Sequence, residues 1–326
     1  MNEFKLSILI TFYNQIEYVD RLLNSIFSQE TKYEYEIIVG DDGSNDGTYE
    51  RLEEWQKEKK NIRIYRFDRN GTAITGFRAS RNRLFLLSKA SGKYSLFFDG
   101  DDFICDNNKL EKQISILEKY DDCFGCAHNF YYYKSDSDKR LGVNRNLKEG
   151  KVDVYRYWRD LYFHTDTLVF RTCIRESMDV SRLENQFNDN MITYMVIQND
   201  PIYYLEEPMI CYYLTGDGIW TGEKQIISNI RNIYLYDLCI SINHKFKKQT
   251  RIKLFHSWKF LFKVRKEINI ENDEFLKEAH DKGFFFSEQW IQFNTLTIKN
   301  KMRLYIEYLH CFVLFQLSRI RKLIRG

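Results

Sequence analysis

The chain has 326 residues, of which 44% are hydrophobic and 16% aromatic, and its formal net charge is +3. This composition supports one large domain or a domain with an appendage, and the presence of only two prolines argues against long disordered linkers. The charge is unevenly distributed. Residues 226–326 hold 19 Lys and Arg against 9 Asp and Glu, whereas residues 1–225 hold 30 against 37. An acidic N-terminal part suits a site that uses a metal, and a basic C-terminal part suits contact with an anionic surface.

No targeting or membrane-spanning segment is predicted. The apolar run at residues 6–10 is too short for the core of a signal peptide, and no run reaches the roughly 18 apolar residues of a spanning helix. Seven cysteines at scattered spacings predict reduced thiols, and we interpret the lone pair Cys123 and Cys126 as core. We therefore expect a cytoplasmic protein, with a peripheral position on the inner face of the cytoplasmic membrane as an option.

A β-α-β-α-β rhythm runs through the first hundred residues. Continuous apolar segments predict buried parallel strands, and apolar residues at helical spacing predict helices that cover a sheet. The predicted strands span residues 5–12, 36–40, 62–67 and 94–98, and the predicted helices span residues 16–27, 49–59 and 78–91. Asn14 is a predicted cap for the first helix. The alternation predicts the α/β class, with a doubly wound, mostly parallel sheet flanked by helices.

An acidic cluster follows the last of these strands. Asp99, Asp101 and Asp102 lie within four positions, with Gly100 between the first two. Three carboxylates so close together repel one another and are costly to desolvate unless a cation or hydrogen-bond donors compensate. Open α/β sheets bind ligands at the carboxyl ends of their strands, and oxygen ligands favour Mg²⁺ or Mn²⁺. The cluster therefore predicts a divalent metal site, with an ordinary acidic turn as the alternative.

The loop after the second strand, residues 41–48, allows two interpretations. Its acidic and small residues fit several positions of an EF-hand calcium loop, with Asp42 first and Glu53 last. An EF-hand needs an entering helix, however, whereas residues 35–39 predict a buried strand. A loop rich in Asp, Gly and Ser at the carboxyl end of a strand is better placed to bind a nucleotide base and ribose. The dinucleotide and P-loop fingerprints do not occur in the sequence.

Four motifs resemble the successive signatures of family 2 glycosyltransferases. They span residues 7–14, 41–47, 79–82 and 98–102, in the family's order and spacing. In the last motif Phe98 and Gly100 replace the usual Leu and Ser, which keeps the carboxylates, and Arg83-Leu84 stands where a Gly is common. Later segments continue the resemblance to about residue 215: residues 163–171 are similar to the strand below the acceptor site, and residues 201–213 to the closing strand pair.

The resemblance implies the GT-A fold, inverting activity, and Mn²⁺ or Mg²⁺ as cofactor. The metal ligands that it implies are Asp99, Asp101 and Asp102, and the sequence does not separate the last two as direct ligands. The nucleotide-binding residues that it implies are Thr11, Phe12, Tyr13, Asp41, Asp42, Arg81, Asp99 and Gly100. For Arg81, which is assigned to the diphosphate, an ion pair with one of the acidic loops is the alternative.

Asp189 is the catalytic base that the resemblance implies. Residues 187–194 resemble the family's Glu-Asp motif at the start of a helix, with Asn188 in place of the Glu. The helix start gives an independent reason, because the dipole favours an ionised carboxylate there. The alternative is that Asp189 only caps the helix.

The C-terminal region has a different character. Residues 244–266 contain no acidic residue and residues 299–325 contain only Glu307, and both predict basic amphipathic helices. Such helices suit the cytoplasmic leaflet and a lipid-linked acceptor, whereas packing on the catalytic domain or on a partner chain is the alternative. We expect a catalytic domain over residues 1–220, with a nucleotide-sugar half to about 105 and an acceptor half from 106, and a helical extension over residues 221–326.

The sequence thus predicts a metal-dependent inverting glycosyltransferase, either a hexosyl- or an N-acetylhexosaminyltransferase. The expected donor is a nucleoside-diphosphate sugar, with UDP as the family tendency. The expected acceptor is a glycan or a lipid-linked acceptor in the synthesis of a bacterial surface polysaccharide such as capsule or lipopolysaccharide. The alternatives are a nucleotidyltransferase of similar fold, which would want a Gly-rich basic loop after the first strand, and a non-catalytic sugar-nucleotide or calcium-binding protein. Nucleic acid is not an expected partner; a homo-oligomer is compatible with the sequence.

Overall fold

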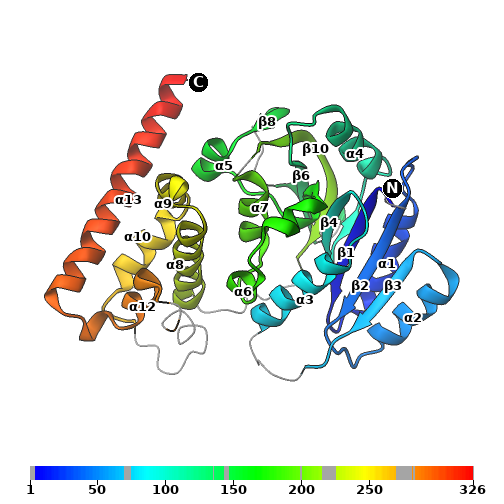
Figure 1. Cartoon of the computed structure of the whole chain (residues 1–326), viewed down its shortest axis with the longest axis horizontal. Helices are drawn as coiled ribbons and strands as arrows, with labels where there is room; N and C mark the ends of the chain where they lie inside the picture. Colours follow the sequence, from blue (N-terminus) through cyan, green and yellow to red (C-terminus); the bar gives the residue numbers. More distant parts are fainter. Residues whose placement is uncertain are drawn as a thin grey trace. The chain divides into compact units, whose positions relative to one another are not determined.

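The computed structural model describes residues 4–69, 75–134, 136–142, 147–198, 200–214, 225–268, 281 and 283–325. The chain forms two compact units (Figure 1). The first comprises Met1–Val154 and Leu161–Gly218, and the second comprises Tyr155–Asp160 and Ile219–Gly326.

The first unit is built on one mixed sheet of ten strands. Eight strands follow the order β3-β2-β1-β4-β9-β6-β10-β5, while β7 pairs with β6 and β8 pairs with β10. Their bounds are β1 Leu6–Phe12, β2 Tyr35–Asp41, β3 Ile62–Arg66, β4 Tyr94–Asp99, β5 Phe103–Ile104, β6 Gly125–Tyr133, β7 Lys139–Leu141, β8 Gly150–Val152, β9 Val169–Arg171 and β10 Ile202–Tyr213.

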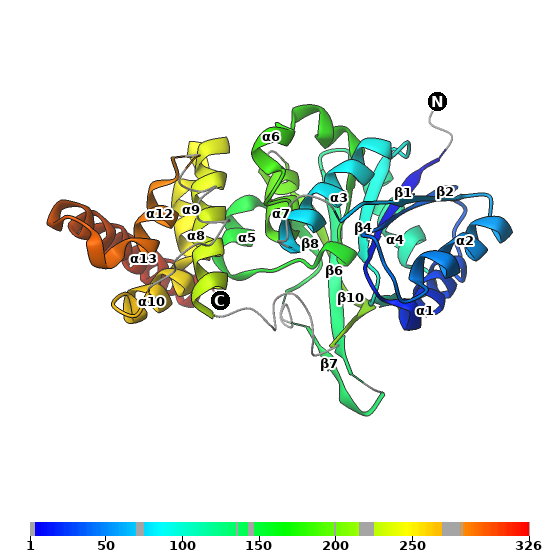
Figure 2. The same ribbon diagram turned by 90° about the horizontal axis from the view of Figure 1, so that it is seen from below.

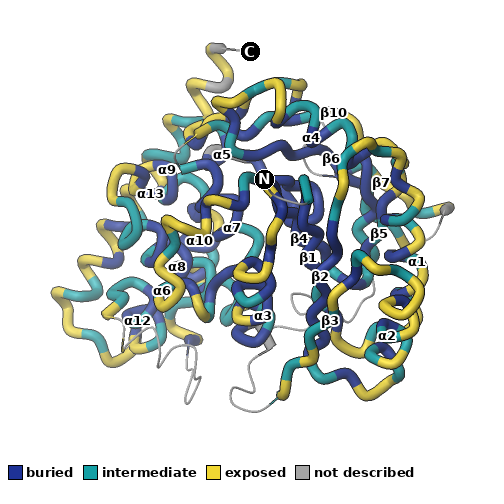
Figure 3. The backbone as a smooth tube through the Cα atoms, turned by 45° about the vertical axis from the view of Figure 1, so that its right-hand side comes forward, coloured by how far each residue is buried: buried dark blue, intermediate teal, exposed yellow. Residues whose placement is uncertain are grey.

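The predicted parallel strands form the half of the sheet that holds β3, β2, β1 and β4. The apolar runs of β1, β2 and β4 are buried on both faces, as expected of central parallel strands, and Figure 3 shows β1 and β4 mainly as buried backbone. The register sets Phe12 opposite Asp41 and Thr11 opposite Asp99. The loops that follow β1, β2 and β4 therefore leave the sheet at one edge.

The other half of the sheet is not parallel throughout. The short strand β9 runs antiparallel to both neighbours, β4 and β6, while β6 and β10 are parallel. Residues 201–213, which resemble a strand pair, form the single long strand β10. Its register against β6 shifts between Leu205 and Ile210, around Pro208. A proline cannot donate to the ladder, so the shift falls where a backbone donor is missing.

Helices cover both faces of the parallel half. α3 lies on one face of the sheet, and α1 and α2 lie on the other (Figure 2). The helices of this unit are α1 Ile16–Phe27, α2 Thr48–Glu58, α3 Thr75–Lys89, α4 Lys109–Lys119, α6 Val180–Leu183 and α7 Asp189–Ile197. The three-residue 3₁₀ turn Thr165–Thr167 precedes β9, and two further 3₁₀ turns span Asp136–Asp138 and Thr172–Ser177.

The predicted cap of α1 is wrong. Asn14 has a left-handed backbone, with φ of 50°, and its side-chain oxygen accepts a hydrogen bond from the amide of Asn45. The first amides of the helix are instead satisfied by the loop after β2, because Asp46 accepts from the Ile16 amide at 3.1 Å and Thr48 accepts from the Gln15 amide at 2.9 Å. The two loops at this edge of the sheet are thus joined.

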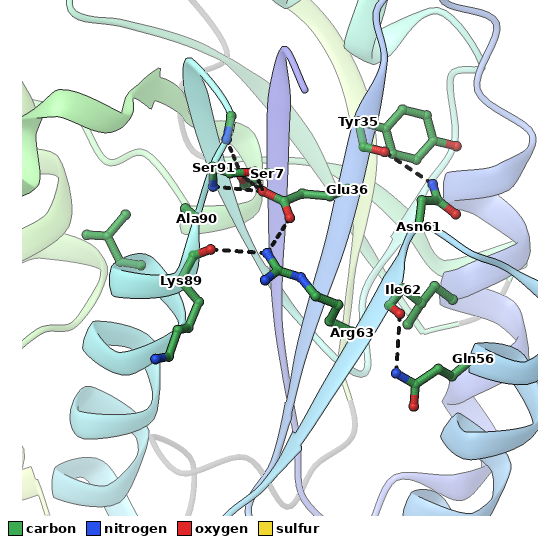
Figure 4. Close-up of polar contacts among 12 residues, drawn as sticks. Ser7, Tyr35, Glu36, Gln56, Asn61, Ile62, Arg63, Lys89, Ala90 and Ser91 are labelled. Carbon is green, nitrogen blue, oxygen red and sulfur yellow. Dashed lines mark hydrogen bonds and ion pairs between the residues drawn. The ribbon is translucent and has the colours of Figure 1, made fainter. Parts of the chain in front are cut away.

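A buried carboxylate holds the opposite edge of the sheet together (Figure 4). Glu36, at the start of β2, accepts hydrogen bonds from the Ser7 hydroxyl at 2.6 Å and from the Ser91 amide and hydroxyl at 2.8 and 2.6 Å. Arg63 on β3 pairs with the same carboxylate and also donates to the carbonyl of Lys89. Burial alone would raise the pKa of Glu36, but these donors outweigh it and lower the pKa.

The second unit consists of helices. They are α5 Val154–Asp160, of which residues 155–160 belong here, α8 Gln225–Ile242, α9 Lys247–Lys253, α10 Phe255–Val264, α12 Phe285–Ile291 and α13 Ile298–Arg325, with 3₁₀ turns at His244–Phe246 and Phe293–Thr295. The core is aromatic, and the Trp258 ring makes edge contacts with Tyr236 and Trp290 at centroid distances of 6.0 and 5.6 Å. Among the described residues, no helix combines the length and apolar composition needed to cross a bilayer.

A buried ion pair ties α13 to the rest of this unit. Glu307 on α13 is 4% exposed, forms an ion pair with Arg251 on α9, and accepts a hydrogen bond from the Tyr236 hydroxyl at 2.5 Å. Because a buried charge without a partner is strongly unfavourable, this carboxylate specifies which side of α13 packs inward.

Glu307→Ala should lower the free energy of unfolding by about 3–5 kcal/mol, because it leaves the Arg251 guanidinium buried without its partner. Urea unfolding followed by circular dichroism measures the change. Glu54→Ala is the matched control: it removes the carboxylate of an exposed Arg–Glu pair, with Arg51, and should cost about 1 kcal/mol or less. Equal effects of the two changes would show that the buried pair does not hold α13.

Candidate functional site

The acidic turn begins where β4 ends. The amide of Gly100 donates to the carbonyl of Thr11 at 3.1 Å, so β1 fixes the start of the turn. Arg21 on α1 donates to the carbonyl of Asp101 at 2.6 Å, and its guanidinium lies over the rings of Phe103 and Tyr213 at 4.7 and 4.4 Å. The backbone of the turn is thus held from both sides, while the Asp101 carboxylate stays partly accessible.

The space around residue 100 requires a glycine, because a side chain does not fit there. A Cβ atom at this position would lie against the buried ring of Phe12 and the side-chain oxygen of Gln15, closer than real atoms pack. This explains why the residue is Gly where related motifs commonly carry Ser. It also shows that Phe12, a predicted nucleotide-binding residue, has its ring in the core, so that its backbone alone faces the loops: its carbonyl accepts from the Asp42 amide at 2.9 Å.

Asp102 is fully buried, unlike Asp101. One of its oxygens accepts a hydrogen bond from the Tyr213 amide on β10 at 2.7 Å, and the other lies 4.0 Å from Nδ1 of His164. Burial, followed by the neighbouring carboxylate of Asp166, raises the pKa of Asp102 well above its ordinary value. Asp102 therefore links the acidic turn to the end of β10.

The segment before β9 contributes two residues that sequence reasoning missed. His164 and Asp166 are 4% and 0% exposed, and His164 Nδ1 lies 3.4 Å from Asp166. Asp99, His164 and Asp166 each offer a ligand atom, and these atoms all lie within 4.8 Å of one another. The signal was present in the sequence: a histidine and an aspartate interrupt an apolar run at residues 161–170, and buried ionisable groups need partners.

Arg83 supplies the positive charge in this cluster. This residue of α3 is 9% exposed, donates to Asp99 at 2.7 Å and approaches Asp189 at 3.6 Å. Arg81, the predicted diphosphate ligand, pairs with Glu184 at 3.2 Å, just after α6 and outside both acidic loops. On a helix, residues two positions apart point to different sides, so only one of these arginines can reach the carboxylates at the edge of the sheet.

Asp189 opens α7 but does not cap it. Asn188 is the N-cap, and its side-chain oxygen accepts from the Met191 amide at 3.1 Å. The Asp189 carboxylate accepts instead from the Tyr162 hydroxyl at 2.8 Å and from the Thr165 hydroxyl at 3.1 Å. Burial acts to raise its pKa, but His164, Arg83 and the two hydroxyls outweigh burial, so the pKa lies below the ordinary value and the group is ionised at neutral pH.

The donor set fits a divalent cation. Among the described residues, His164 Nδ1, both carboxylate oxygens of Asp166 and one oxygen of Asp102 are buried without a hydrogen-bond partner. The pKa of His164, which burial alone would lower, is raised to about 9 by Asp166, Asp189 and Asp99, so a metal bound at Nδ1 would have to displace a proton. Carboxylates outnumber cationic groups here, and unpaired buried acceptors are costly, so a cation would relieve both.

The loop after β2 forms a second cluster beside the first. Asp41 is fully buried and accepts from the amides of Gly43 and Ser44 at 3.1 and 3.0 Å. Asp42 accepts from Asn82 at 2.9 Å and from Arg78 at 3.1 Å, both on α3.

Tyr13 and Arg69 lie at the mouth of this loop. Tyr13 is 39% exposed, and the Arg69 guanidinium lies 3.6 Å from its ring centroid and 3.7 Å from Asp42. Tyr13 and Asp42, which were predicted to bind the nucleotide, are thus close together, and a planar base could contact both.

The calcium-loop alternative does not fit this geometry. The segment that enters the loop, Tyr35–Asp41, is a β-strand and not a helix. Asp42 is held by Arg78 and Asn82, and Asp46 accepts from Ile16 and Thr48, so both carboxylates point into the protein's own hydrogen bonds. The EF-hand hypothesis is therefore wrong.

Comparison with known proteins agrees with this geometry. The model of glycosyl transferase family 2 matches residues 7–176, which is about half of the chain. The sequence is 27% identical over 224 residues to an uncharacterised protein of Mycobacterium tuberculosis, covering 66% of this chain and 60% of that one. It is 30% identical over 179 residues to poly(ribitol-phosphate) beta-N-acetylglucosaminyltransferase TarS of Staphylococcus aureus, covering 54% and 29%. The chain thus spans less than two thirds of these relatives.

Solved structures show the same fold. Residues 1–349 of S. aureus TarS in complex with UDP match with a TM-score of 0.63 at 15% identity, over 99% of this chain and 92% of that one. A mannosyltransferase from Pyrobaculum calidifontis, in complex with GDP-Man and Mn²⁺, matches with a TM-score of 0.51 at 13% identity over 98% and 87%. The fold is that of the GT-A glycosyltransferases. The chain belongs to glycosyl transferase family 2.

Gly100→Ala should lower the free energy of unfolding by about 1–3 kcal/mol, because the added methyl group overpacks against the Phe12 ring. Thermal or urea unfolding measures the loss. Adding Phe12→Leu to the same chain should recover part of the lost stability. The effects of the two changes on the free energy of unfolding should therefore depart from additivity by more than about 0.5 kcal/mol. Strict additivity would mean that the two side chains do not compete for the same space.

Proposed function

We propose that this protein is a metal-dependent, inverting glycosyltransferase that uses a nucleoside-diphosphate sugar, with a UDP-sugar as the first candidate. The acceptor is a glycan or a lipid-linked molecule in the synthesis of a bacterial surface polysaccharide. We assign the transfer of a hexosyl or N-acetylhexosaminyl group to the first unit, because every residue of the proposed site belongs to it.

The position of Asp189 carries this proposal. Because Asn188 caps the helix, the Asp189 carboxylate is not used as a cap, and Arg83 connects it to the acidic cluster. Its two hydroxyl partners, Tyr162 and Thr165, orient it and keep it ionised. An ionised, oriented carboxylate near the metal-binding groups is what a general base needs in order to take the proton of an acceptor hydroxyl.

The donor would bind along the carboxyl edge of β1, β2 and β4. We assign the base to Tyr13 and Asp42, in a loop whose backbone the buried Asp41 holds, and the ribose to the region of Thr11 and Asp99. Register supports this, since it places Asp41 and Asp99 on either side of the end of β1. Structures of TarS hold UDP and UDP-GlcNAc, which supports a uridine nucleotide as the first to test.

Asp99, His164 and Asp166 are the groups whose ligand atoms are close enough to share one ion. Asp101 and Asp102 remain the ligands that the sequence motif implies, and Asp102 has one oxygen already engaged by Tyr213. A bound Mn²⁺ or Mg²⁺ would supply Lewis-acid neutralisation of the diphosphate leaving group. The mixed oxygen and nitrogen donor set suits Mn²⁺ somewhat better than Mg²⁺.

In the reaction, the acceptor oxygen would attack the anomeric carbon on the face opposite the diphosphate. The new C–O bond forms as the bond to the diphosphate oxygen breaks, through a state with oxocarbenium character, and the acceptor proton passes to Asp189. A single displacement of this kind inverts the anomeric centre. Arg83, between Asp99 and Asp189, would hold the base at a fixed distance from the donor side.

We infer the acceptor class from a relative of this chain. TarS is named for transfer of N-acetylglucosamine to poly(ribitol phosphate), and it shares both sequence and fold with this chain. A cytoplasmic enzyme acting on a growing surface polymer, at the inner face of the membrane, is consistent with the charge distribution of the chain.

Thermal shift across UDP, GDP, CDP and dTDP, with and without Mn²⁺, tests the donor and the metal. A ligand at 100 times its Kd stabilises by about 2.7 kcal/mol, so one nucleotide should raise the melting temperature by several degrees only when Mn²⁺ is present. Asp99→Asn and His164→Ala should remove the metal-dependent part, and EDTA should reverse it. Equal stabilisation by a nucleotide with and without Mn²⁺ would overturn metal dependence.

Asp189→Asn should reduce transfer by about 10²–10⁴-fold, because an amide cannot accept the acceptor's proton. Donor affinity should stay within about threefold, since the change is isosteric. Release of nucleoside diphosphate and formation of glycosylated product are the readouts. Asp179→Asn, which alters an exposed aspartate at the start of another helix, α6, should leave both unchanged. Retained transfer in Asp189→Asn would remove this residue as the base.

A further inference from the structure

Helix α13 has two faces of opposite character. Leu304, Glu307 and Cys311 lie one turn apart and are buried against the second unit. On the same side the Phe315 ring stacks on Phe255 of α10 at 4.5 Å. Since the Glu307 carboxylate pairs with Arg251, this side of the helix is fixed inward.

The opposite side of α13 is apolar and exposed. At about 100° per residue, these positions fall within an arc of roughly 140°. The exposed apolar residues on this side are Ile298, Met302, Tyr305, Ile306, Leu309, Phe312, Val313, Leu317, Ile320, Leu323 and Ile324, with exposed fractions from 39% to 81%. A stripe of this length on the surface of a folded unit indicates an interaction site.

Basic residues follow both edges of this apolar stripe. On the helical projection Lys299, Arg303 and Arg321 lie along one edge, and Lys301 and Arg319 lie along the other. The one acidic residue of the helix, Glu307, is buried and already paired. Among the described residues, none of these five cations forms an ion pair.

We propose that α13 binds the surface of an anionic lipid bilayer, with its axis in the plane of the membrane. The apolar stripe would enter the boundary between headgroups and acyl chains, while Lys299, Arg319 and Arg321 reach the phosphates. Arg303 and Lys301 lie over the rings of Phe285 and Phe293 at 3.6 and 5.5 Å and add positive charge beside the stripe. Each Lys or Arg close to an anionic surface strengthens binding by about 5-fold. The inference needs neither a donor nor a metal and stands apart from the proposed chemistry.

The positive charge of α13 favours a lipid surface over a second copy of this chain as the partner. If two α13 helices packed through their apolar stripes, basic edges would meet basic edges, with no exposed carboxylate on either helix to pair with them. An anionic bilayer offers the opposite charge along both edges at once. The second predicted amphipathic segment, residues 244–266, does not offer such a face, because Phe246, Phe255 and Trp258 are buried.

Flotation of the full chain with lipid vesicles tests this proposal. Wild type should bind vesicles of phosphatidylethanolamine containing about one third phosphatidylglycerol, and should bind phosphatidylcholine vesicles at least about 10-fold more weakly. Leu309→Glu should weaken binding to the anionic vesicles by about 10-fold or more, because it places a charge in the apolar stripe. Val180→Glu is the matched control, since Leu309 and Val180 are both 54% exposed, and it should bind as wild type does.

The charge requirement is tested separately. Arg319→Gln/Arg321→Gln should weaken binding by about 25-fold and reduce its salt dependence, whereas Lys57→Gln/Lys60→Gln on the first unit should not. Unchanged melting temperatures would show that all variants are folded. Absence of binding, binding indifferent to anionic lipid, or equal binding by Leu309→Glu would overturn the proposal. So would sedimentation that shows a lipid-free oligomer which Leu309→Glu dissociates, because the stripe would then be a protein interface.

Discussion

Five carboxylates gather at one edge of the sheet: those of Asp99, Asp101, Asp102, Asp166 and Asp189. Because they repel one another, the groups around them must offset their negative charge. The guanidinium of Arg83 lies between the end of β4 and the start of α7 and contacts a carboxylate of each. Without a buried cation in this position, bringing two ionised groups from distant parts of the chain together would be strongly unfavourable. The remaining buried oxygens, unpaired among the described residues, are what make the cluster suited to a metal.

The sheet brings these residues, which are far apart in the sequence, together in one cluster. Parallel pairing of β2, β1 and β4 places the loop of Asp41 and the turn of Asp99 on either side of the end of β1. The antiparallel strand β9 then carries the segment of His164 and Asp166 to the same edge. At the other edge, Glu36 joins three strands through hydrogen bonds, so this paired carboxylate and the carboxylate cluster lie at opposite ends of the strands.

Sequence reasoning succeeded where the signal is local and periodic. The first strands and helices, the acidic turn and the family signatures all follow from runs of residues adjacent in the chain. It failed where the answer depends on which side of an element faces the site. Arg81 and Arg83 differ by two positions on one helix, and only the packing of α3 decides that the second reaches the carboxylates. The role of Asn14 likewise depends on a neighbour distant in sequence, the amide of Asn45.

The fold class, the family and the basic character of the C-terminal region follow from the sequence, because each depends on composition or on short spacings. The tertiary structure was needed to show which arginine pairs with the cluster, that His164 and Asp166 belong to the cluster, and that Asn188 and not Asp189 caps α7. It also decided that residues 244–266 bury their apolar side chains while α13 exposes one stripe. The physical reason is the same in each case: burial, and the pairing that buried charge demands, are properties of contacts between segments and not of the segments themselves.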